Sequence, residues 1–226
     1  MARPSQLGFE PILEFSFRQR QAAILRYCRA NGDKYRGFAE FITPDRTRWE
    51  SVWDRLAFAI LSANVPFADA VAALGLSSKH RGDADPRLLR KYRMVPAKAE
   101  YLNRLPLGRG IFALLRQDSE SWDGYRVRLR DTVPGLGLTK ASFAACLLYP
   151  LEADLACVDT HMQKVYLRRT SFGRLSHTEY LAVESKIRKI ADAVGCNTFL
   201  AQWQIWDHAR GVQESHAIFP GAHKGD

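Results

Sequence analysis

The sequence lacks the features that would place the chain in a membrane, a metalloprotein or a small secreted scaffold. Its first 13 residues have no apolar core of the kind found in signal peptides. No run of about 18 apolar residues, the length that a membrane-spanning helix needs, occurs anywhere. The 4 cysteines have neither metal-ligand spacing nor the pattern of a disulfide framework, which predicts reduced, structural thiols at Cys28, Cys146, Cys157 and Cys196. We therefore expect a cytoplasmic or nuclear protein without metal or membrane.

Internal repeats, low-complexity segments and strand-like alternation of useful length are also missing. What is present is helical spacing of apolar residues, as in Trp49, Val52, Trp53, Leu56 and Ile60. Such spacing predicts an all-α fold, in which glycines at 32 and 75 end two of the helices. The predicted helices are 17–30, 49–63, 67–74, 88–92, 96–102, 111–116, 122–131, 141–149, 159–173, 181–194 and 198–209. The tail 220–226 should be mobile.

Positive charge is in excess. The 226 residues include 33 Lys and Arg but 24 Asp and Glu, which gives a formal net charge of +9. Residues 87–109 are the most basic part, with seven Lys or Arg and a single acid, Glu100. A basic protein attracts polyanions such as nucleic acids through long-range electrostatics. Because many basic proteins bind no nucleic acid, the charge by itself favours this partner only modestly.

A glycine turn and a later carboxylate are the strongest chemical signals. In Pro134-Gly135-Leu136-Gly137, no large side chain blocks the approach of a phosphate to the backbone amides, and the helix that follows adds a positive dipole end. Asp159 comes 19 residues after Lys140 and stands where it can cap the next helix. The stretch thus pairs a predicted phosphate clamp with a carboxylate.

Four sequence blocks occur in the order of a known family. They are Leu61-Ser62-Ala63-Asn64, Ala97-Lys98-Ala99-Glu100, the hairpin 133–137, and Val158-Asp159-Thr160-His161. In these blocks the sequence resembles the helix-hairpin-helix Gly/Pro-Asp superfamily of DNA glycosylases, which includes endonuclease-III-like, adenine-mismatch and 8-oxoguanine enzymes. The resemblance covers roughly residues 50–211.

The resemblance implies two helical lobes with a DNA-binding cleft between them. One lobe would be 55–170, with the helix-hairpin-helix motif at about 122–149, and the other would combine 1–54 with 171–226. The implied partner is double-stranded DNA with a damaged or modified base, and the implied state is a monomer. Only Cys196 follows Asp159, so no iron-sulfur cluster is expected. No other cofactor is implied, although a monovalent cation at the hairpin stays an option.

Asp159 and Lys140 are the candidate catalytic residues. Such enzymes extrude the target nucleotide, and a carboxylate then stabilises positive charge on the sugar or activates a water molecule. Asp159 would do this, unless it only caps its helix. Bifunctional members use a lysine two residues after the last hairpin glycine, where this chain has Thr139. One helical residue is a rotation of about 100°, which favours a Lys140 that faces away from the pocket, as a phosphate contact or a solvated lysine. An inserted residue in the hairpin would instead leave Lys140 as the amine nucleophile. A monofunctional reaction with water is slightly preferred.

The resemblance also assigns binding residues. Asn64 would enter the gap left by the extruded nucleotide, or else be a turn residue before Pro66, and Lys98 would contact phosphate or be solvated. Aromatic residues on one helix could stack on the extruded base, or else belong to the core. The candidates for DNA binding are Pro134, Gly135, Gly137, Thr139, Lys98 and Asn64, and those for the base pocket are Trp203, Phe199 and His161, a neighbour of Asp159.

Two other functions stay open. The form of the hairpin and of Cys157-Val158-Asp159-Thr160-His161 is similar to glycosylase-fold proteins of phages, some of which are implicated in thymine hypermodification. Such a transferase attaches an amine or amino acid to an activated hydroxymethyl-pyrimidine in DNA, and if the chain is phage-encoded it would act in the host cytoplasm. The second alternative is a non-catalytic DNA-binding module that uses the hairpin for phosphate contact alone.

Overall fold

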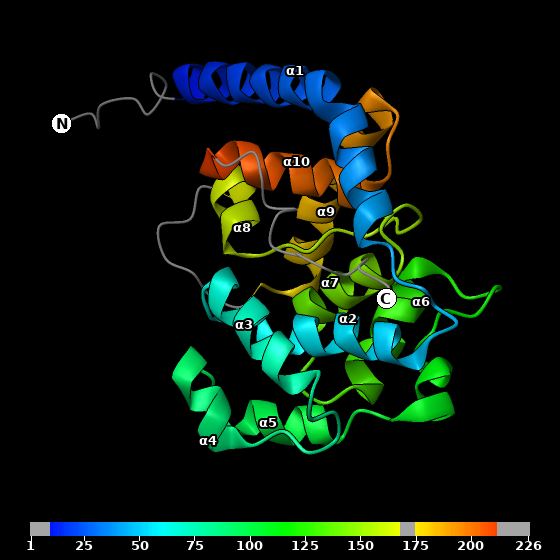
Figure 1. Cartoon of the computed structure of the whole chain (residues 1–226). Coiled ribbons are helices and arrows are strands. Elements are labelled where there is room, and N and C mark those ends of the chain that lie inside the picture. The colour runs from blue at the N-terminus through cyan, green and yellow to red at the C-terminus, as the bar shows by residue number, and fades with distance from the viewer. Residues whose placement is uncertain (1–9, 168–174, 212–226) are drawn as a thin grey trace.

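A computed structural model describes residues 10–167 and 175–211, with side chains from Gln19 onward. Within these ranges the ordered elements are helices, so the predicted all-α class is confirmed (Figure 1). They are α1 (Glu10–Ile42), α2 (Trp49–Leu61), α3 (Phe67–Ser77), α4 (Pro86–Leu89), α5 (Pro96–Asn103), α6 (Trp122–Thr132), α7 (Leu138–Leu148), α8 (Thr160–Leu167), α9 (His177–Val194) and α10 (Thr198–Arg210), with short 3-10 turns η2 (Arg90–Tyr92) and η3 (Gly108–Leu114). The helix end expected near Gly173 and the tail 220–226 lie outside the described residues.

Two helices continue past the glycines that were predicted to end them. The predicted stops at Gly32 and Gly75 are wrong, because α1 continues to Ile42 and α3 to Ser77. Beyond Gly32, α1 buries Tyr35, Ala39 and Ile42 at helical spacing. Burial of this face outweighs the cost of about 1 kcal/mol for a glycine in a helix interior. Across the described residues, each helix is too short or too polar to cross a membrane.

The buried apolar side chains form two clusters. The central core is built on α2 and α7, which α3, α5, η3 and α6 surround, and it also takes in Tyr35 of α1 and Trp203 of α10. The terminal core joins α1, α8, α9 and α10. In Figure 1, α1 lies above α10, whereas α4 and α5 lie at the opposite end of the molecule. The terminal core therefore joins the N-terminal helix to the C-terminal helices, at the end of the molecule away from α4 and α5.

The predicted lobe boundaries do not coincide with these cores. α8 falls in the lobe 55–170, but its Met162 and Tyr166 are buried in the terminal core. α2 starts at Trp49, and its Val52 and Trp53 belong to the central core. The division into two lobes stays a prediction.

A non-helical segment between α7 and α8 carries Asp159, and side chains of α9 hold this segment. The Tyr180 hydroxyl donates to the Ala156 carbonyl oxygen at 2.6 Å. Glu184 Oε1 accepts from the Ala156 amide at 2.8 Å and pairs with Arg126 Nη1 of α6 at 2.9 Å. Arg126 and Glu184 are both almost fully buried, so removal of one partner would leave an uncompensated charge. The α6–α9 pair thus fixes the backbone that leads to Asp159.

Candidate functional site

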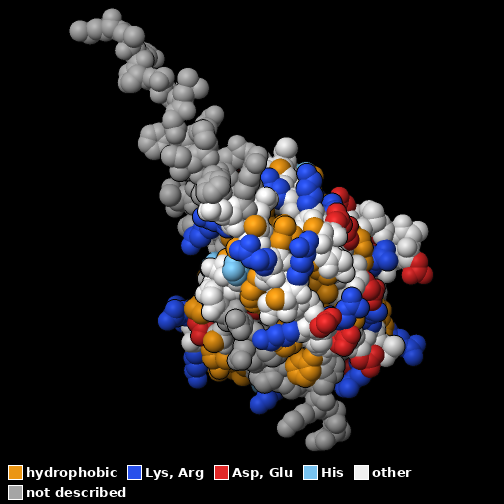
Figure 2. Space-filling model, turned by 90° about the horizontal axis from the view of Figure 1, so that it is seen from above, with side chains coloured by type: hydrophobic (Ala, Val, Ile, Leu, Met, Phe, Trp, Pro, Cys, Tyr) orange, Lys and Arg blue, Asp and Glu red, His pale blue; other side chains and the backbone are white. Residues whose placement is uncertain are grey.

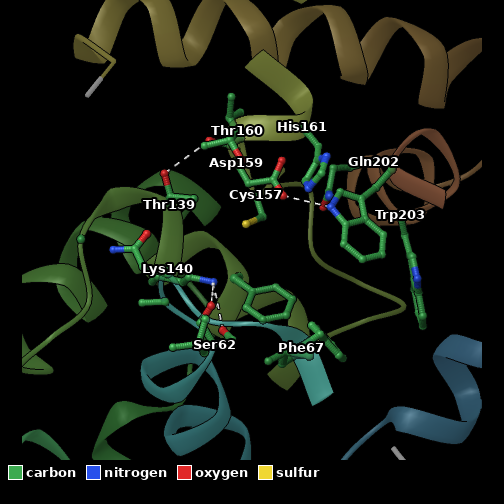
Figure 3. Close-up of a pocket in the computed structure, with 18 of the residues that line it drawn as sticks. Ser62, Phe67, Thr139, Lys140, Cys157, Asp159, Thr160, His161, Gln202 and Trp203 are labelled. Atoms are coloured by element: carbon green, nitrogen blue, oxygen red, sulfur yellow. Dashed lines mark hydrogen bonds between the residues drawn. The ribbon is translucent and has the colours of Figure 1, made fainter. Parts of the chain in front are cut away.

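One cavity of about 680 Å³ is lined by segments that lie far apart in the sequence. They are the loop after α2, the start of α7, the segment 157–163 and one face of α10 (Figure 3). Cavities that bind small molecules span about 300–1,000 Å³. Three of the four family blocks contribute to the lining, while the block at 97–100 does not.

Asp159 faces this cavity and also caps α8. Its Oδ1 accepts a hydrogen bond from the Met162 amide at 2.9 Å, and its Oδ2 accepts one from Trp206 Nε1 at 2.9 Å. The capping role weighed from the sequence is therefore present. The cap occupies one oxygen and leaves the carboxylate partly exposed at the cavity, so both roles fit the same residue.

Lys140 also lines the cavity, so the expectation that it faces away is wrong. Gly137 is the N-cap of α7, and Leu138 is its first residue. Lys140 lies in the first turn, from which its long side chain reaches across to the loop after α2. Its Nζ donates to Ser62 Oγ at 2.9 Å and to the Ser62 carbonyl oxygen at 3.2 Å (Figure 3). A rotation of one helical residue does not take Lys140 out of the cavity, because Thr139 and Lys140 both border it.

Burial lowers the pKa of the Lys140 amine below the usual lysine value. The acidic groups of Cys157 and Asp159 oppose this shift but are outweighed. Figure 3 shows the Cys157 side chain between the positions of Lys140 and Asp159. A lysine in such surroundings releases its proton more readily, which is what an amine nucleophile requires.

Lys98 is buried rather than solvated, and its position does not favour the expected phosphate contact. Only 6% of it is exposed. Its Nζ donates to the carbonyl oxygens of Leu61 at 2.7 Å and Ala63 at 2.6 Å. Leu61 is the last residue of α2 and Ala63 follows its C-cap, so neither carbonyl has a partner within the helix and the ammonium satisfies both. Lys98 and Lys140 together thus hold three consecutive carbonyls, those of Leu61, Ser62 and Ala63.

Replacing Lys98 by methionine tests this role. Burial, and next the charge of Lys140, lower the pKa of Lys98 to about 8. Loss of the donors in Lys98→Met should reduce the free energy of unfolding by about 1–3 kcal/mol at pH 7. The unfolded chain binds the proton more tightly, so the Lys98 contribution to wild-type stability increases as the pH rises from about 8 to the ordinary lysine pKa. The deficit of the variant should widen over that window in urea unfolding series.

The control is Lys91→Met, which removes an exposed lysine of η2. If Lys98→Met and Lys91→Met unfold with the same free energy at each pH, Lys98 does not hold the end of α2.

The hairpin contains two glycines with different requirements. Gly135 has φ +86°, and a Cβ there would press into the Tyr101 ring, 2.9 Å from its Cγ. Gly137 has φ −78°, and a Cβ there would meet nothing within 4 Å. The fold therefore requires glycine at 135. At Gly137 the backbone is exposed and the space beside it is open, which fits the predicted approach of a phosphate. Pro134 of the same turn is half-buried, and its contact with DNA stays a prediction.

An alanine at each glycine should separate folding from binding. Gly135→Ala should lower the free energy of unfolding by about 1–3 kcal/mol, because of the positive φ and the Tyr101 contact. Gly137→Ala should cost less stability, because φ −78° suits alanine and only the N-cap preference for glycine is lost, but it should weaken duplex binding about tenfold, since its methyl group occupies the space of the phosphate. Thermal unfolding and fluorescence anisotropy at fixed salt measure the two effects. Wild-type affinity in Gly137→Ala would contradict the phosphate role.

Other predicted residues also border the cavity. Asn64 is exposed at the loop after α2 with φ +57°, a left-handed conformation that asparagine tolerates. Thr139 donates to the Val158 carbonyl oxygen at 3.4 Å. Their contacts with DNA stay predictions.

The aromatic candidates lie at the cavity but are mostly buried. Trp203 packs against Phe199, with ring centroids 5.6 Å apart, and against Tyr35 at 5.8 Å. His161 lies edge-on to the ring of Trp206, with centroids 5.9 Å apart. The core role weighed for Phe199 and Trp203 is therefore evident, while stacking on a base stays a prediction.

Sequence reasoning missed two glutamines and the role of Trp206. Gln163 and Gln202 line the cavity, and each has a buried side-chain oxygen without a hydrogen-bond partner among the described residues. Gln163 lies one turn after Asp159, and Gln202 one turn before Trp206, so helical spacing was the available signal. The described residues contain no group of His, Cys, Asp or Glu that could hold a metal ion.

The helices match solved DNA glycosylases in three dimensions, which defines the fold class. The 8-oxoguanine DNA glycosylase of Thermotoga maritima superposes with a TM-score of 0.70 at 22% identity, covering 86% of this chain and 98% of that one. The Methanocaldococcus jannaschii 8-oxoguanine glycosylase/lyase was solved with a 15mer DNA containing 8-oxoguanine. It superposes with a TM-score of 0.68 at 17% identity, covering 84% of this chain and 98% of that one. The 8-oxoguanine DNA glycosylase of the same archaeon superposes with a TM-score of 0.70 at 18% sequence identity, covering 86% of this chain and 97% of that one.

Neither protein-family models nor curated protein sequences match this chain. The chain thus shares its fold with these 8-oxoguanine DNA glycosylases.

Proposed function

We propose that the protein is a DNA glycosylase that excises a damaged or modified base from double-stranded DNA. The observation that carries the proposal is the meeting of Lys140 and Asp159 at one cavity, beside a glycine hairpin. A base inside a duplex is inaccessible, so the target nucleotide would be extruded into this cavity. The cavity volume of about 680 Å³ suits an occupant of that size class.

Electrostatics and backbone geometry support DNA as the partner. The net charge of +9 attracts a polyanion, and Figure 2 shows Lys and Arg side chains spread over the face that includes α1, with Asp and Glu gathered toward one side. Gly135 and Gly137 are exposed at the start of α7, where backbone amides and the helix dipole favour a phosphate. Asn64, exposed in the loop after α2 that also lines the cavity, would fill the gap in the duplex.

Asp159 would stabilise the transition state. Departure of the base builds positive charge on the sugar, and a carboxylate fixed nearby lowers the energy of that charge. Two hydrogen bonds hold the carboxylate before the substrate arrives, so it need not reorganise during the reaction. Asp159 would act in this way whether the attacking group is an amine or water.

Lys140 would be the nucleophile, which changes the preference for water drawn from the sequence. The deprotonated amine would attack the anomeric carbon of the sugar, forming a carbon–nitrogen bond while the glycosidic bond breaks and the base leaves with its electron pair. The adduct would lose a proton and open to a Schiff base, from which the strand can be nicked. Two properties of Lys140 support this role: its side chain lines the cavity, and burial lowers the pKa of its amine.

Mass spectrometry of nucleosides after incubation with a panel of modified duplexes tests the proposal. A free base with an abasic or nicked strand is the expected result. A heavier nucleoside would instead indicate a transferase that modifies the base. Duplex binding without any product, on a panel that includes 8-oxoguanine, would indicate a binding module and contradict the proposal.

A further inference from the structure

Trp206 connects α10 to the candidate catalytic carboxylate. Its Nε1 donates to Asp159 Oδ2 at 2.9 Å. The guanidinium carbon of Arg210 lies 4.2 Å from the centre of the indole, a cation–π contact. The rings of His161 and Phe67 lie 5.9 Å and 6.4 Å from it. The indole is thus held by neighbours from three segments that line the cavity.

This hydrogen bond completes the restraint on the carboxylate. The cap to the Met162 amide holds Oδ1 alone, and a carboxyl group bound at one oxygen still turns easily about its terminal torsion. The bond from Trp206 holds Oδ2 from a different helix. With both oxygens held, the orientation of Asp159 is fixed by tertiary structure and not only by its own helix.

The restraint also bears on Lys140. Within the described residues, Lys140 and Asp159 line the same cavity but form no ion pair, and the Lys140 amine lies against Ser62 instead. If the carboxylate turned toward the amine, the two groups would pair, and the amine would keep its proton. In such a pair, the protonated amine could not act as a nucleophile, and the neutralised carboxylate could not stabilise positive charge on the sugar.

We propose that Trp206 is a positioning residue, whose indole N–H holds Asp159 toward the cavity and apart from Lys140. The kinetic consequence rests on the proposed function, while the hydrogen bond itself can be measured without it. Stacking of Trp206 on an extruded base is the competing role. It would need the aromatic ring but not the N–H group, so phenylalanine distinguishes the two roles.

The kinetic test compares Trp206→Phe with Trp122→Phe. Trp122 also lies against an arginine, at 4.5 Å from Arg116, but it does not line the cavity. In single-turnover excision, Trp206→Phe should be slower by roughly ten- to a hundredfold, the worth of one hydrogen bond to a charged group, at unchanged duplex affinity. Trp122→Phe should retain the wild-type rate. A wild-type rate in Trp206→Phe, or weaker binding at an unchanged rate, would overturn the proposal.

The pH dependence of excision is a second measurement, and it would not shift if Trp206→Phe only loosened the packing around residue 206. In Trp206→Phe the freed carboxylate can pair with Lys140, so the pH below which excision is lost should shift upward. Six titratable or charged groups face this site from the surrounding elements: Lys140, Cys157, Asp159, His161, Arg210 and, behind Lys140, Lys98. The shift should disappear in Trp206→Phe combined with Asp159→Asn, measured by the residual rate or by borohydride trapping.

Nuclear magnetic resonance of the indole N–H signals tests the bond without activity. The chain has 5 tryptophans, and Trp206→Phe identifies the relevant signal by its loss. In the wild type this signal should have the chemical shift of an N–H group that donates to a carboxylate, and in Asp159→Ala that shift should be lost. An indole N–H signal at the same position in the wild type and in Asp159→Ala sinks the proposal even if excision is confirmed. If the signal responds as expected but the wild type releases no base, the proposed function fails and the hydrogen bond stands.

Discussion

Asp159→Asn should lose base excision by about 10²–10⁴-fold while it binds duplex DNA as tightly as the wild type. The substitution removes the negative charge that would stabilise positive charge on the sugar. The amide can accept only through its oxygen, so it satisfies either the Met162 amide or Trp206 Nε1, but not both. We therefore also expect a stability loss of about 1 kcal/mol. Single-turnover rates and thermal unfolding measure the two effects.

A control separates the specific role of Asp159 from a general change in charge. Asp192→Asn removes one carboxylate from the exposed surface of α9, so it alters net charge by the same amount. It should excise and bind as the wild type does. Full excision by Asp159→Asn, on a substrate that the wild type processes, would remove Asp159 from the mechanism.

Lys140→Arg should lose excision by about a thousandfold or more, and with it the covalent adduct trapped by borohydride. Arginine keeps the positive charge and can still donate to Ser62, but it cannot be deprotonated in a protein. Duplex affinity should therefore change little, whereas a mere phosphate contact at 140 would tolerate arginine in both assays. Lys164→Arg, an exposed position on α8, is the matched control and should form the adduct normally.

The pH dependence of the wild type follows from the same amine. Burial disfavours the charged form and lowers the pKa of Lys140, and only the deprotonated form is nucleophilic. Excision should therefore be lost as the pH falls through this lowered pKa, below the pH at which an ordinary lysine would lose activity. An excision rate that persists in Lys140→Arg without a trapped adduct would return the preference to water as the nucleophile.

Helical periodicity and turn chemistry could be read from local sequence. The apolar spacing of α2 and α9, the glycine turn before α7 and the carboxylate at the start of α8 each depend on residues within a few positions of one another. The same locality explains the errors at Gly32 and Gly75, since a glycine lowers local helix propensity whereas burial against distant helices decides whether the helix ends. Gly135 was recognised as a turn residue, but its contact with Tyr101 was not visible.

The apolar spacing of the helices and the order of the motifs by themselves predicted an all-helical chain, a hairpin suited to phosphate and the candidacy of Asp159. Only the tertiary structure decided that Lys140 enters the cavity, that Lys98 holds the end of α2, and that Trp206 reaches Asp159 across 47 positions of sequence. The physical reason is that the direction and environment of a side chain depend on packing between helices. A count of residues along one helix does not contain that packing.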